Sequence, residues 1–482
     1  MKVIKRRDFL GLSTGATAAF FLSQCGKIAL TNRPGSALAQ AQTYRSEGGV
    51  LRVDLEAIPQ SVPLGGQSTN LLTYNGLVPG PRLEASPGDT VQIHFTNRLN
   101  QPTNLHYHGL HIPPTGTGDN VFLAIPPGES HTYEFQIPID HSAGTFWYHP
   151  HYHGLTAEQL FGGLAGLFIV RGDLDEIPEI KAAPEAFLVL KDFGRDRRGN
   201  IPNPGHMAQM TGRIGDLLSV NGQINPTLPI SPRGLLRLRV LNASSSRFFR
   251  LSLEGHPFEL IATDGGAIAA PITVPAAVLA PGERVELLVQ GNQSPGSYRL
   301  LNHPFNPAQG MMGHGGMMGG PGQAQNQGRA EAIATLTYGG TVDEMPMPSQ
   351  LIPVEPLPEP QTVRQFTLSH GHGGVFMING QTFDHQRVDT QVTLNTVEDW
   401  EIINRGMMTH PFHIHVNKFQ VISRNNQPVA DAAWKDVVSL SPGERVRIRI
   451  PFRDYPGKTV YHCHVLDHED RGMMGVLDIQ PV

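Results

Sequence analysis

Four His-x-His pairs are the residues of this 482-residue sequence whose spacing most strongly suggests chemistry. The pairs are His106/His108, His149/His151, His413/His415 and His462/His464. On a β-strand, residues i and i+2 project from the same face about 6.6 Å apart, which is too wide for one small ion but suits two neighbouring ions. Eight imidazoles on four such strands can therefore surround a cluster of several metal ions. Two pairs lie in the first third of the chain and two in the last, so we expect a middle domain to hold the two halves of the cluster together.

A second metal site is indicated by the segment 462–473. Because neighbouring side chains on a strand face opposite ways, Cys463 points away from the two histidines that flank it. It can join His410, His468 and Met473, and two His, one Cys and a weak axial Met are the ligands of a blue-copper electron-transfer centre. A structural zinc site with Cys and His ligands is the alternative. Zinc would give Met473 no purpose and would leave the eight paired histidines unexplained.

The two predicted sites share one short peptide, which suggests how they work together. Cys463 would bind the first copper, and its two sequence neighbours would bind the cluster. Electrons taken singly from a reductant could then pass along Cys463 and the flanking peptides. Dioxygen needs four electrons to become water, and a group of coppers can store and deliver that number. The pattern therefore predicts a copper oxidase that uses dioxygen.

The elements that carry these residues recur three times along the chain. Each copy has a strand that ends at Asn, then a Pro-Gly-Glu turn, then an alternating strand, and then a Gly-led strand with an aromatic residue. The turns are Pro127-Gly128-Glu129, Pro281-Gly282-Glu283 and Pro442-Gly443-Glu444, and the asparagines are Asn97, Asn242 and Asn404. Short alternating strands with turns at this spacing predict an all-β protein built of β-sandwiches. Helix should be scarce, with one turn at 158–161.

The repeats divide the chain into three domains. We place domain 1 at residues 43–172, domain 2 at 173–342 and domain 3 at 360–482, with a Pro-rich linker at 343–359. Domain 2 contains a Gly- and Met-rich insertion at 306–327, whose composition cannot pack a core.

Composition and the N-terminus indicate where the protein works. Arg6-Arg7-Asp8-Phe9-Leu10 and the apolar stretch after it read as a twin-arginine signal over residues 1–39, with cleavage after Ala39. Removing it changes the net charge from −5 to −10 and leaves one cysteine, Cys463. With no basic patch and no further stretch of about 20 apolar residues, we expect neither nucleic acid as a partner nor a membrane span. A monomer in the periplasm or outside the cell is the expectation.

The motifs around these ligands resemble a known family. His106-Tyr107-His108-Gly109, Trp147-Tyr148-His149-Pro150-His151, His410-Pro411-Phe412-His413-Ile414-His415 and the segment 462–473 are similar to the four copper motifs of multicopper oxidases. The resemblance covers nearly all of residues 43–482 and is strongest for bacterial laccase-like and cuprous-oxidase members. It implies three cupredoxin-like Greek-key β-sandwich domains and four copper ions.

The resemblance also implies a division of the ligands. Type 1 copper would be bound by His410, Cys463, His468 and Met473, and type 2 copper by His106 and His413. The type 3 pair would be bound by His108, His149, His151, His415, His462 and His464. Glu469 and Asp119 would supply the protons that dioxygen reduction consumes. The alternative for both acids is an ordinary solvated surface position.

The predicted electron donors follow from the ligands of the sulfur-containing site. A Met axial ligand suits phenols, aromatic amines and Cu(I) as electron donors. Thioethers bind Cu(I), so the insertion could collect it and the two residues before Thr409 could pass it on; these residues are Met311, Met312, Met317, Met318, Met407 and Met408. Cuprous-oxidase relatives have an acid where this chain has Gly406. The rival hypotheses are a non-enzymatic copper-binding protein and a structural cupredoxin protein of the cell envelope.

Overall fold

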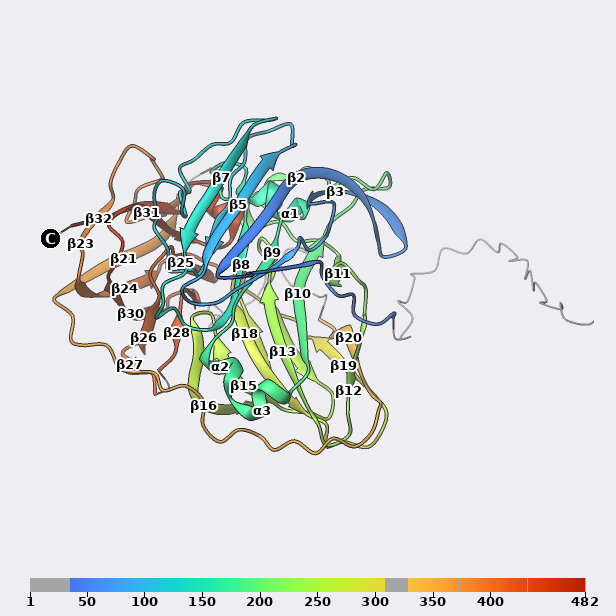
Figure 1. Cartoon of the computed structure of the whole chain (residues 1–482). Coiled ribbons are helices and arrows are strands. Elements are labelled where there is room, and N and C mark those ends of the chain that lie inside the picture. The colour runs from blue at the N-terminus through green and yellow to red at the C-terminus, as the bar shows by residue number, and fades with distance from the viewer. Residues whose placement is uncertain (1–34, 308–327, 372, 431, 482) are drawn as a thin grey trace, which may run out of the picture. The chain divides into compact units, whose positions relative to one another are not determined.

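The computed structural model describes residues 35–307, 328–371, 373–430 and 432–481, and these form three pairs of β-sheets in chain order (Figure 1). Helices are short and lie between strands: α1 (Thr156–Gly162), α2 (Asp173–Glu176), α3 (Pro178–Ala182), α4 (His206–Thr211) and α5 (Leu466–Asp470). The all-β prediction is confirmed, and the predicted helical turn belongs to the longer α1. No helix within the described ranges is long and apolar enough to cross a membrane.

The first pair of sheets contains strands from residues 43–170. One sheet has the order β3-β2-β5-β7, from β2 (Val50–Leu64), β3 (Gln67–Tyr74), β5 (Thr90–Asn97) and β7 (Ser130–Gln136). The other has the order β1-β4-β9-β8-β6, from β1 (Thr43–Arg45), β4 (Arg82–Ala85), β6 (His106–His108), β8 (Gly144–His149) and β9 (Gly166–Val170). The first two His-x-His pairs begin in β6 and at the end of β8.

The second pair of sheets contains strands from residues 185–338. One sheet has the order β11-β10-β13-β18-β15-β16, from β10 (Glu185–Phe193), β11 (Leu217–Val220), β13 (Leu235–Asn242), β15 (Phe258–Thr263), β16 (Gly266–Val274) and β18 (Arg284–Gln290). The other has the order β12-β20-β19-β14-β17, from β12 (Thr227–Ile230), β14 (Phe249–Leu253), β17 (Ala277–Leu279), β19 (Ser297–Asn302) and β20 (Glu331–Tyr338).

The third pair of sheets contains strands from residues 362–480. One sheet has the order β22-β21-β24-β30-β26-β27 with β28 beside β26, from β21 (Thr362–His370), β22 (Phe376–Ile378), β24 (Thr396–Asn404), β26 (Phe419–Arg424), β27 (Gln427–Pro428), β28 (Trp434–Lys435) and β30 (Arg445–Phe452). The other has the order β23-β32-β31-β25-β29, from β23 (Thr390–Thr393), β25 (His410–Ile414), β29 (Val437–Leu440), β31 (Gly457–Cys463) and β32 (Met474–Gln480).

The three sheet pairs repeat one local arrangement. In each, a parallel strand pair is followed by an antiparallel partner: β2–β5–β7, β10–β13–β18 and β21–β24–β30. The central strand ends at the repeated Asn, whose backbone carbonyl accepts a hydrogen bond from the Gly of the Pro-Gly-Glu turn. The three turn glycines have φ of 77–85°, a conformation that a side chain makes costly. The repeated turn in the sequence is thus one structural device used three times.

Each sheet pair closes over its own apolar core. Strand β2 shows the pattern, because alternate residues from Leu51 to Ala57 are buried. A further cluster joins side chains from all three domains, among them Trp147 on β8, Phe187 on β10 and Leu466 on α5. Burial of one large apolar side chain contributes about 1.5–3 kcal/mol. This shared cluster therefore fixes the strands that carry the histidines relative to one another.

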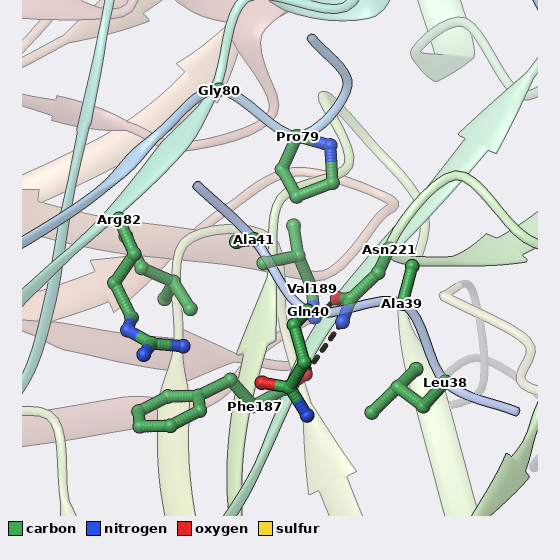
Figure 2. Close-up of a pocket in the computed structure, with 11 residues that line it drawn as sticks. Leu38, Ala39, Gln40, Ala41, Pro79, Gly80, Arg82, Phe187, Val189 and Asn221 are labelled. Atoms are coloured by element: carbon green, nitrogen blue, oxygen red, sulfur yellow. Dashed lines mark hydrogen bonds between the residues drawn. The ribbon is translucent and has the colours of Figure 1, made fainter. Parts of the chain in front are cut away.

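Residues 35–42 lie against the first and second sheet pairs. The Gly35 amide donates to the Asn225 carbonyl (2.9 Å), and the Leu38 amide donates to the Thr227 carbonyl (3.0 Å). Residues 38–41 also line a small pocket beside Arg82 and Phe187 (Figure 2). Residues 35–39, which the sequence places at the end of the signal segment, therefore contact β12 and the loop before it.

Candidate metal centres

The four His-x-His pairs converge from two antiparallel strand pairs. His106 on β6 is opposite His149 on β8, and His413 on β25 is opposite His462 on β31. All eight paired histidines are at most 2% exposed. The structure thus gathers the first and last thirds of the chain around one buried group of imidazoles, and the described residues of the middle third contribute no imidazole to it.

One group of three imidazoles points ring nitrogens directly at one another. The Nε2 atom of His462 lies 3.1 Å from Nε2 of His151 and 3.0 Å from Nε2 of His415. A metal ion about 2.1 Å from each of three ligands separates those ligands by about 3.4–3.6 Å, close to what is seen. This group can hold one ion.

A second group of three consists of His108, His149 and His464, whose ligand atoms lie within 4.8 Å of one another. His149 Nδ1 lies 2.9 Å from the Pro150 carbonyl. The remaining nitrogen, Nε2, is buried and has no hydrogen-bond partner among the described residues, and the same is true of both nitrogens of His464. A buried nitrogen with no partner is costly unless a ligand satisfies it, so these atoms also fit a metal ion.

His106 and His413 form the third part of the cluster, together with the shared His108. His106 Nδ1 lies 2.8 Å from Asp119 Oδ1, and His413 Nδ1 lies 2.8 Å from the Asp436 carbonyl. Both Nε2 atoms are buried without a partner in the described part of the chain. Each ring is therefore oriented by a protein oxygen and offers its second nitrogen to an ion.

Burial keeps these imidazoles in the neutral form that binds metals. It lowers the pKa of His151 to about 4 and that of His464 to about 3, and the neighbouring His462 adds to the effect. The pKa values of His106, His108, His149, His413 and His415 are lowered well below the ordinary value by burial and by other imidazoles of the cluster. Lone pairs are thus available without competition from protons.

Cys463 forms a separate centre with two further histidines. Its Sγ lies 3.3 Å from His410 Nδ1 and 3.8 Å from His468 Nδ1, and the two Nδ1 atoms are 3.3 Å apart. Met473 is fully buried in the same core cluster, and its carbonyl accepts a hydrogen bond from the Cys463 amide (3.0 Å). Burial raises the pKa of the Cys463 thiol, so a bound cation is needed to hold it as a thiolate.

The outer side of His468 is covered rather than open. His468 Nε2 lies 3.2 Å from the Met210 carbonyl in α4, and the Phe376 ring stacks on the imidazole at 3.9 Å. His410 is also buried, at 1% exposed. Both imidazoles are therefore buried, and a helix from the middle of the chain packs over His468.

The two acids predicted to supply protons are both buried beside the cluster. Asp119 lies against His106, and its Oδ2 is 3.6 Å from His415 Nδ1. Glu469 lies 3.1 Å from His462 Nδ1 and 3.7 Å from His151 Nε2. Burial raises the pKa of Asp119 to about 8, whereas the facing imidazoles outweigh burial at Glu469 and lower its pKa. Neither acid occupies the solvated surface position that was the alternative.

The methionines predicted to handle Cu(I) are only partly located. Met407 is 52% exposed, and Met408 is half-buried. Both lie in the loop just before His410. Met311, Met312, Met317 and Met318 lie outside the described residues.

Sequence reasoning missed Asp436 and α4. Asp436 accepts a hydrogen bond from His108 Nε2 (3.0 Å) through its carboxylate and contacts His413 through its carbonyl. It stands 328 residues from His108 in the chain. α4 contacts His468 through the backbone carbonyl of Met210. Neither contact leaves a pattern in the sequence, since both depend on how the sheet pairs pack.

Comparisons with known proteins agree with this arrangement. Family models described as multicopper oxidase match residues 58–175, 191–326 and 356–482. A multicopper oxidase of Staphylococcus haemolyticus is 31% identical over 419 residues, covering 85% of this chain and 84% of the relative. A solved multicopper oxidase of Campylobacter jejuni, described as a metallo-oxidase, superposes with a TM-score of 0.83 and 31% identity over 93% of this chain and 96% of its own.

The chain belongs to the multicopper oxidase family, whose members are copper-containing oxidoreductases that use dioxygen. The prediction of three cupredoxin-like domains is confirmed. A cell division protein FtsP of Photorhabdus laumondii is also similar, at 30% identity over 440 residues covering 87% of both chains.

Proposed function

We propose that this chain is a laccase-like multicopper oxidase that couples one-electron oxidation of phenols, of Cu(I), or of both to the four-electron reduction of dioxygen to water. The observation that carries the proposal is the shared tripeptide 462–464. Cys463 belongs to the sulfur-containing centre, and the histidines on either side of it belong to two different imidazole groups. That arrangement suits a protein that takes up electrons at the sulfur-containing centre and uses them at the imidazole cluster.

Four copper ions fit the donor atoms. His410, Cys463, His468 and Met473 would hold a type 1 ion, and His106 and His413 a type 2 ion. The groups His108–His149–His464 and His151–His415–His462 would hold the type 3 pair. Bound copper would supply one-electron transfer at the first centre and dioxygen reduction at the cluster.

The side chains contribute orientation, dryness and protons. Buried oxygens fix which nitrogen of His106 and of His413 is free, and the apolar shell around Cys463 keeps water from its sulfur. Asp119 contacts His415 of the His151–His415–His462 group (3.6 Å), and Glu469 contacts the other two imidazoles of that group (3.1 and 3.7 Å). They can pass protons toward the site where dioxygen is reduced.

Replacing Cys463 by Ser tests the central claim. The variant, loaded with copper, should lose the blue absorption band and oxygen consumption, because serine offers no soft thiolate. It should retain the copper bound by the paired histidines. Met474→Leu is the matched control, since Met474 is buried one residue beyond the predicted ligand Met473. A blue band in Cys463→Ser, or undiminished oxygen uptake, would overturn the proposal.

We base the proposed substrates on the residues that surround His468 and His410. α4 and Phe376 cover His468, which limits direct contact with a bulky phenol. Exposed Met407 and the Met-rich insertion offer soft ligands for Cu(I), although Gly406 replaces the acid found in cuprous-oxidase relatives. Deleting residues 307–322 should lower Cu(I) turnover and hardly change diphenol turnover. Equal effects on both substrates would remove the insertion from substrate delivery.

A second candidate function is that of a copper-binding or structural protein of the cell envelope without turnover. The similarity to FtsP supports it, whereas the complete set of buried ligands argues against it. Metal analysis after growth with copper, followed by oxygen uptake with a phenolic dye, separates the candidates. Copper without turnover would indicate a store, and no copper would indicate a structural role.

We also propose export by the twin-arginine route to the periplasm or the medium, as a monomer. The support is the sequence of residues 1–39. Cell fractionation with N-terminal sequencing tests this proposal and locates the cleavage site. If the mature protein begins at Gln40, the contacts of residues 35–39 with the middle domain exist only in the precursor.

A further inference from the structure

A single buried acid, Asp436, supports two imidazoles of the cluster. Its Oδ1 accepts a hydrogen bond from His108 Nε2–H (3.0 Å), and its backbone carbonyl accepts one from His413 Nδ1–H (2.8 Å). The two rings stack with centroids 3.8 Å apart and 9° between their planes. These bonds leave His108 Nδ1 and His413 Nε2 as the free atoms, both buried without a partner in the described residues. One residue thus decides which nitrogen two different rings present.

The carboxylate of Asp436 is in turn held by Arg284 of β18. The guanidinium donates to both carboxylate oxygens, at 2.8 and 2.6 Å, and neither residue is more than 1% exposed. Arg284 also donates to the Asp264 carbonyl (2.8 Å) in the middle domain and to the Thr145 carbonyl (3.0 Å) on β8, the strand that carries His149. This one side chain therefore connects all three domains next to the cluster.

The backbone near the first His-x-His pair approaches this ion pair closely. A Cβ atom at Gly109 would lie 2.5 Å from Arg284 Nη2 and 2.6 Å from Asp436 Oδ2, and Gly109 has φ of 87°. Glycine is required there because any side chain would displace the ion pair. A Cβ at Gly282, two residues before Arg284, would lie 2.9 Å from His464 Nε2. The middle domain thus packs against the cluster without contributing a ligand.

We propose that Asp436 is a positioning residue for the metal cluster, and that Arg284 makes its position depend on the docked middle domain. This inference rests on the proposed function, since it assumes that the paired histidines hold copper. Stability alone does not account for the arrangement, because a buried ion pair is often no better than apolar residues of the same size. A hydrogen-bonded acceptor behind a metal-binding imidazole typically changes metal affinity by about 10–100-fold.

The test compares Asp436→Asn with Asp264→Asn in the full-length copper-loaded protein. Asp264 is a matched control, because it is equally buried in the same network, where it contacts Lys435 (2.9 Å) and the Arg284 amide (2.8 Å). Within the described part of the chain, its hydrogen bonds and ion pairs reach no imidazole of the cluster. The readouts are copper per chain, the type 2 electron paramagnetic resonance signal, and the blue band. We expect Asp436→Asn to bind cluster copper about 10–100-fold more weakly with an altered type 2 signal and an unchanged blue band. Asp264→Asn should keep both the copper and the signal.

Asp436→Glu is a second variant, which tests the proposal even if Asp436→Asn does not fold. It keeps a negative charge for Arg284 but moves the carboxylate by about 1.5 Å, one carbon–carbon bond. A folded Asp436→Glu protein with an altered type 2 signal supports the proposal. Normal cluster copper and a normal signal in Asp436→Asn and Asp436→Glu would overturn it, as would equal copper loss in the Asp264 control. Wild-type protein that binds no copper would instead overturn the proposed function itself.

Discussion

Four of the eight histidines of the cluster, namely His106, His108, His149 and His413, have one ring nitrogen held by a protein oxygen and the other without a partner in the described residues. The oxygens belong to Asp119, to Asp436 and to the Pro150 carbonyl. Such partners set the tautomer and raise the basicity of the ligand. At the scale of single residues, the site is therefore prepared for metal by acceptors that stand behind the imidazoles.

Asp119 gives the first prediction at this scale. Asp119→Asn keeps an oxygen near His106 but cannot carry a proton, so oxygen consumption should fall by about 10²-fold or more. Reduction of the blue centre by a phenol, followed by stopped-flow absorption, should be unchanged, because Cys463 lies in the other centre. The Asp264→Asn variant serves as the control for a lost buried acid. A slower reduction of the blue centre in Asp119→Asn would contradict a role confined to protons.

Some residues of the site could be predicted from the sequence, and others could not. The ligand histidines and Cys463 were predictable because strand alternation turns spacing in the sequence into spacing in space. Asp119 and Glu469 were identified only by resemblance. Asp436 could not be found, since an acid before a buried strand looks like any other until two domains meet across it.

At the scale of elements, the same asparagine contacts hold each of the three repeated turns; we call these contacts the anchor. Asn97, Asn242 and Asn404 each end a central strand, and each side-chain amide donates to two backbone carbonyls across the turn. The sequence revealed the repetition of Asn and of Pro-Gly-Glu. It could not show that the two motifs bond to each other, because the contact joins two strands of a sheet.

Asn242 tests this anchor away from the predicted ligands. Asn242→Ala leaves the carbonyls of Arg247 and Leu279 without this donor in a buried place, so the free energy of unfolding should fall by about 1–3 kcal/mol. Urea denaturation of the copper-free protein measures the change. Asn292→Ala is a control at an exposed asparagine of the same domain. A change below about 0.5 kcal/mol would show that the anchor contributes little.

α4 gives the second prediction at the scale of elements. Arg471 donates to Gln209 Oε1 of α4 (3.2 Å) and to the carbonyls of Gly373 (3.0 Å) and Gly374 (2.6 Å), so it fastens the helix over His468. Arg471→Ala removes the bond from Arg471 to α4, worth about 1 kcal/mol, which raises the displaced population about fivefold. We expect a lower KM for a bulky diphenol and an unchanged blue band.

Cu(I) turnover and a distant arginine provide the controls for α4. Turnover of Cu(I), which needs little space, should be unaffected in Arg471→Ala, and the exposed Arg198→Ala should leave both substrates unchanged. An unchanged KM for the diphenol would show that α4 does not limit access to His468.

At the scale of the whole molecule, the metal cluster joins the two ends of the chain. His151 and His462 face each other across 311 residues at 3.1 Å. Apart from metal, the domains meet through the mixed apolar cluster around Trp147 and through buried ion pairs such as Arg284–Asp436. The sequence predicted that the first and third domains share the cluster. It also predicted that the middle domain holds the two halves together, but it could not predict which residues do so, because these are ordinary Arg and Gly positions.

Removal of copper should therefore act on the docking of domains more than on their folding. Each domain has its own core, so copper-free protein should keep its β-sheet circular dichroism while melting at a lower temperature, since a ligand bound only to the native state stabilises it by mass action. Limited proteolysis of copper-free protein should cut the segments between domains, near residues 343–359, faster than in the copper-loaded protein. In Asp436→Asn the copper-loaded form should already be cut faster, because the same residue serves both the cluster and the docked middle domain. Equal cutting of all three forms would mean that the apolar cluster alone holds the domains together.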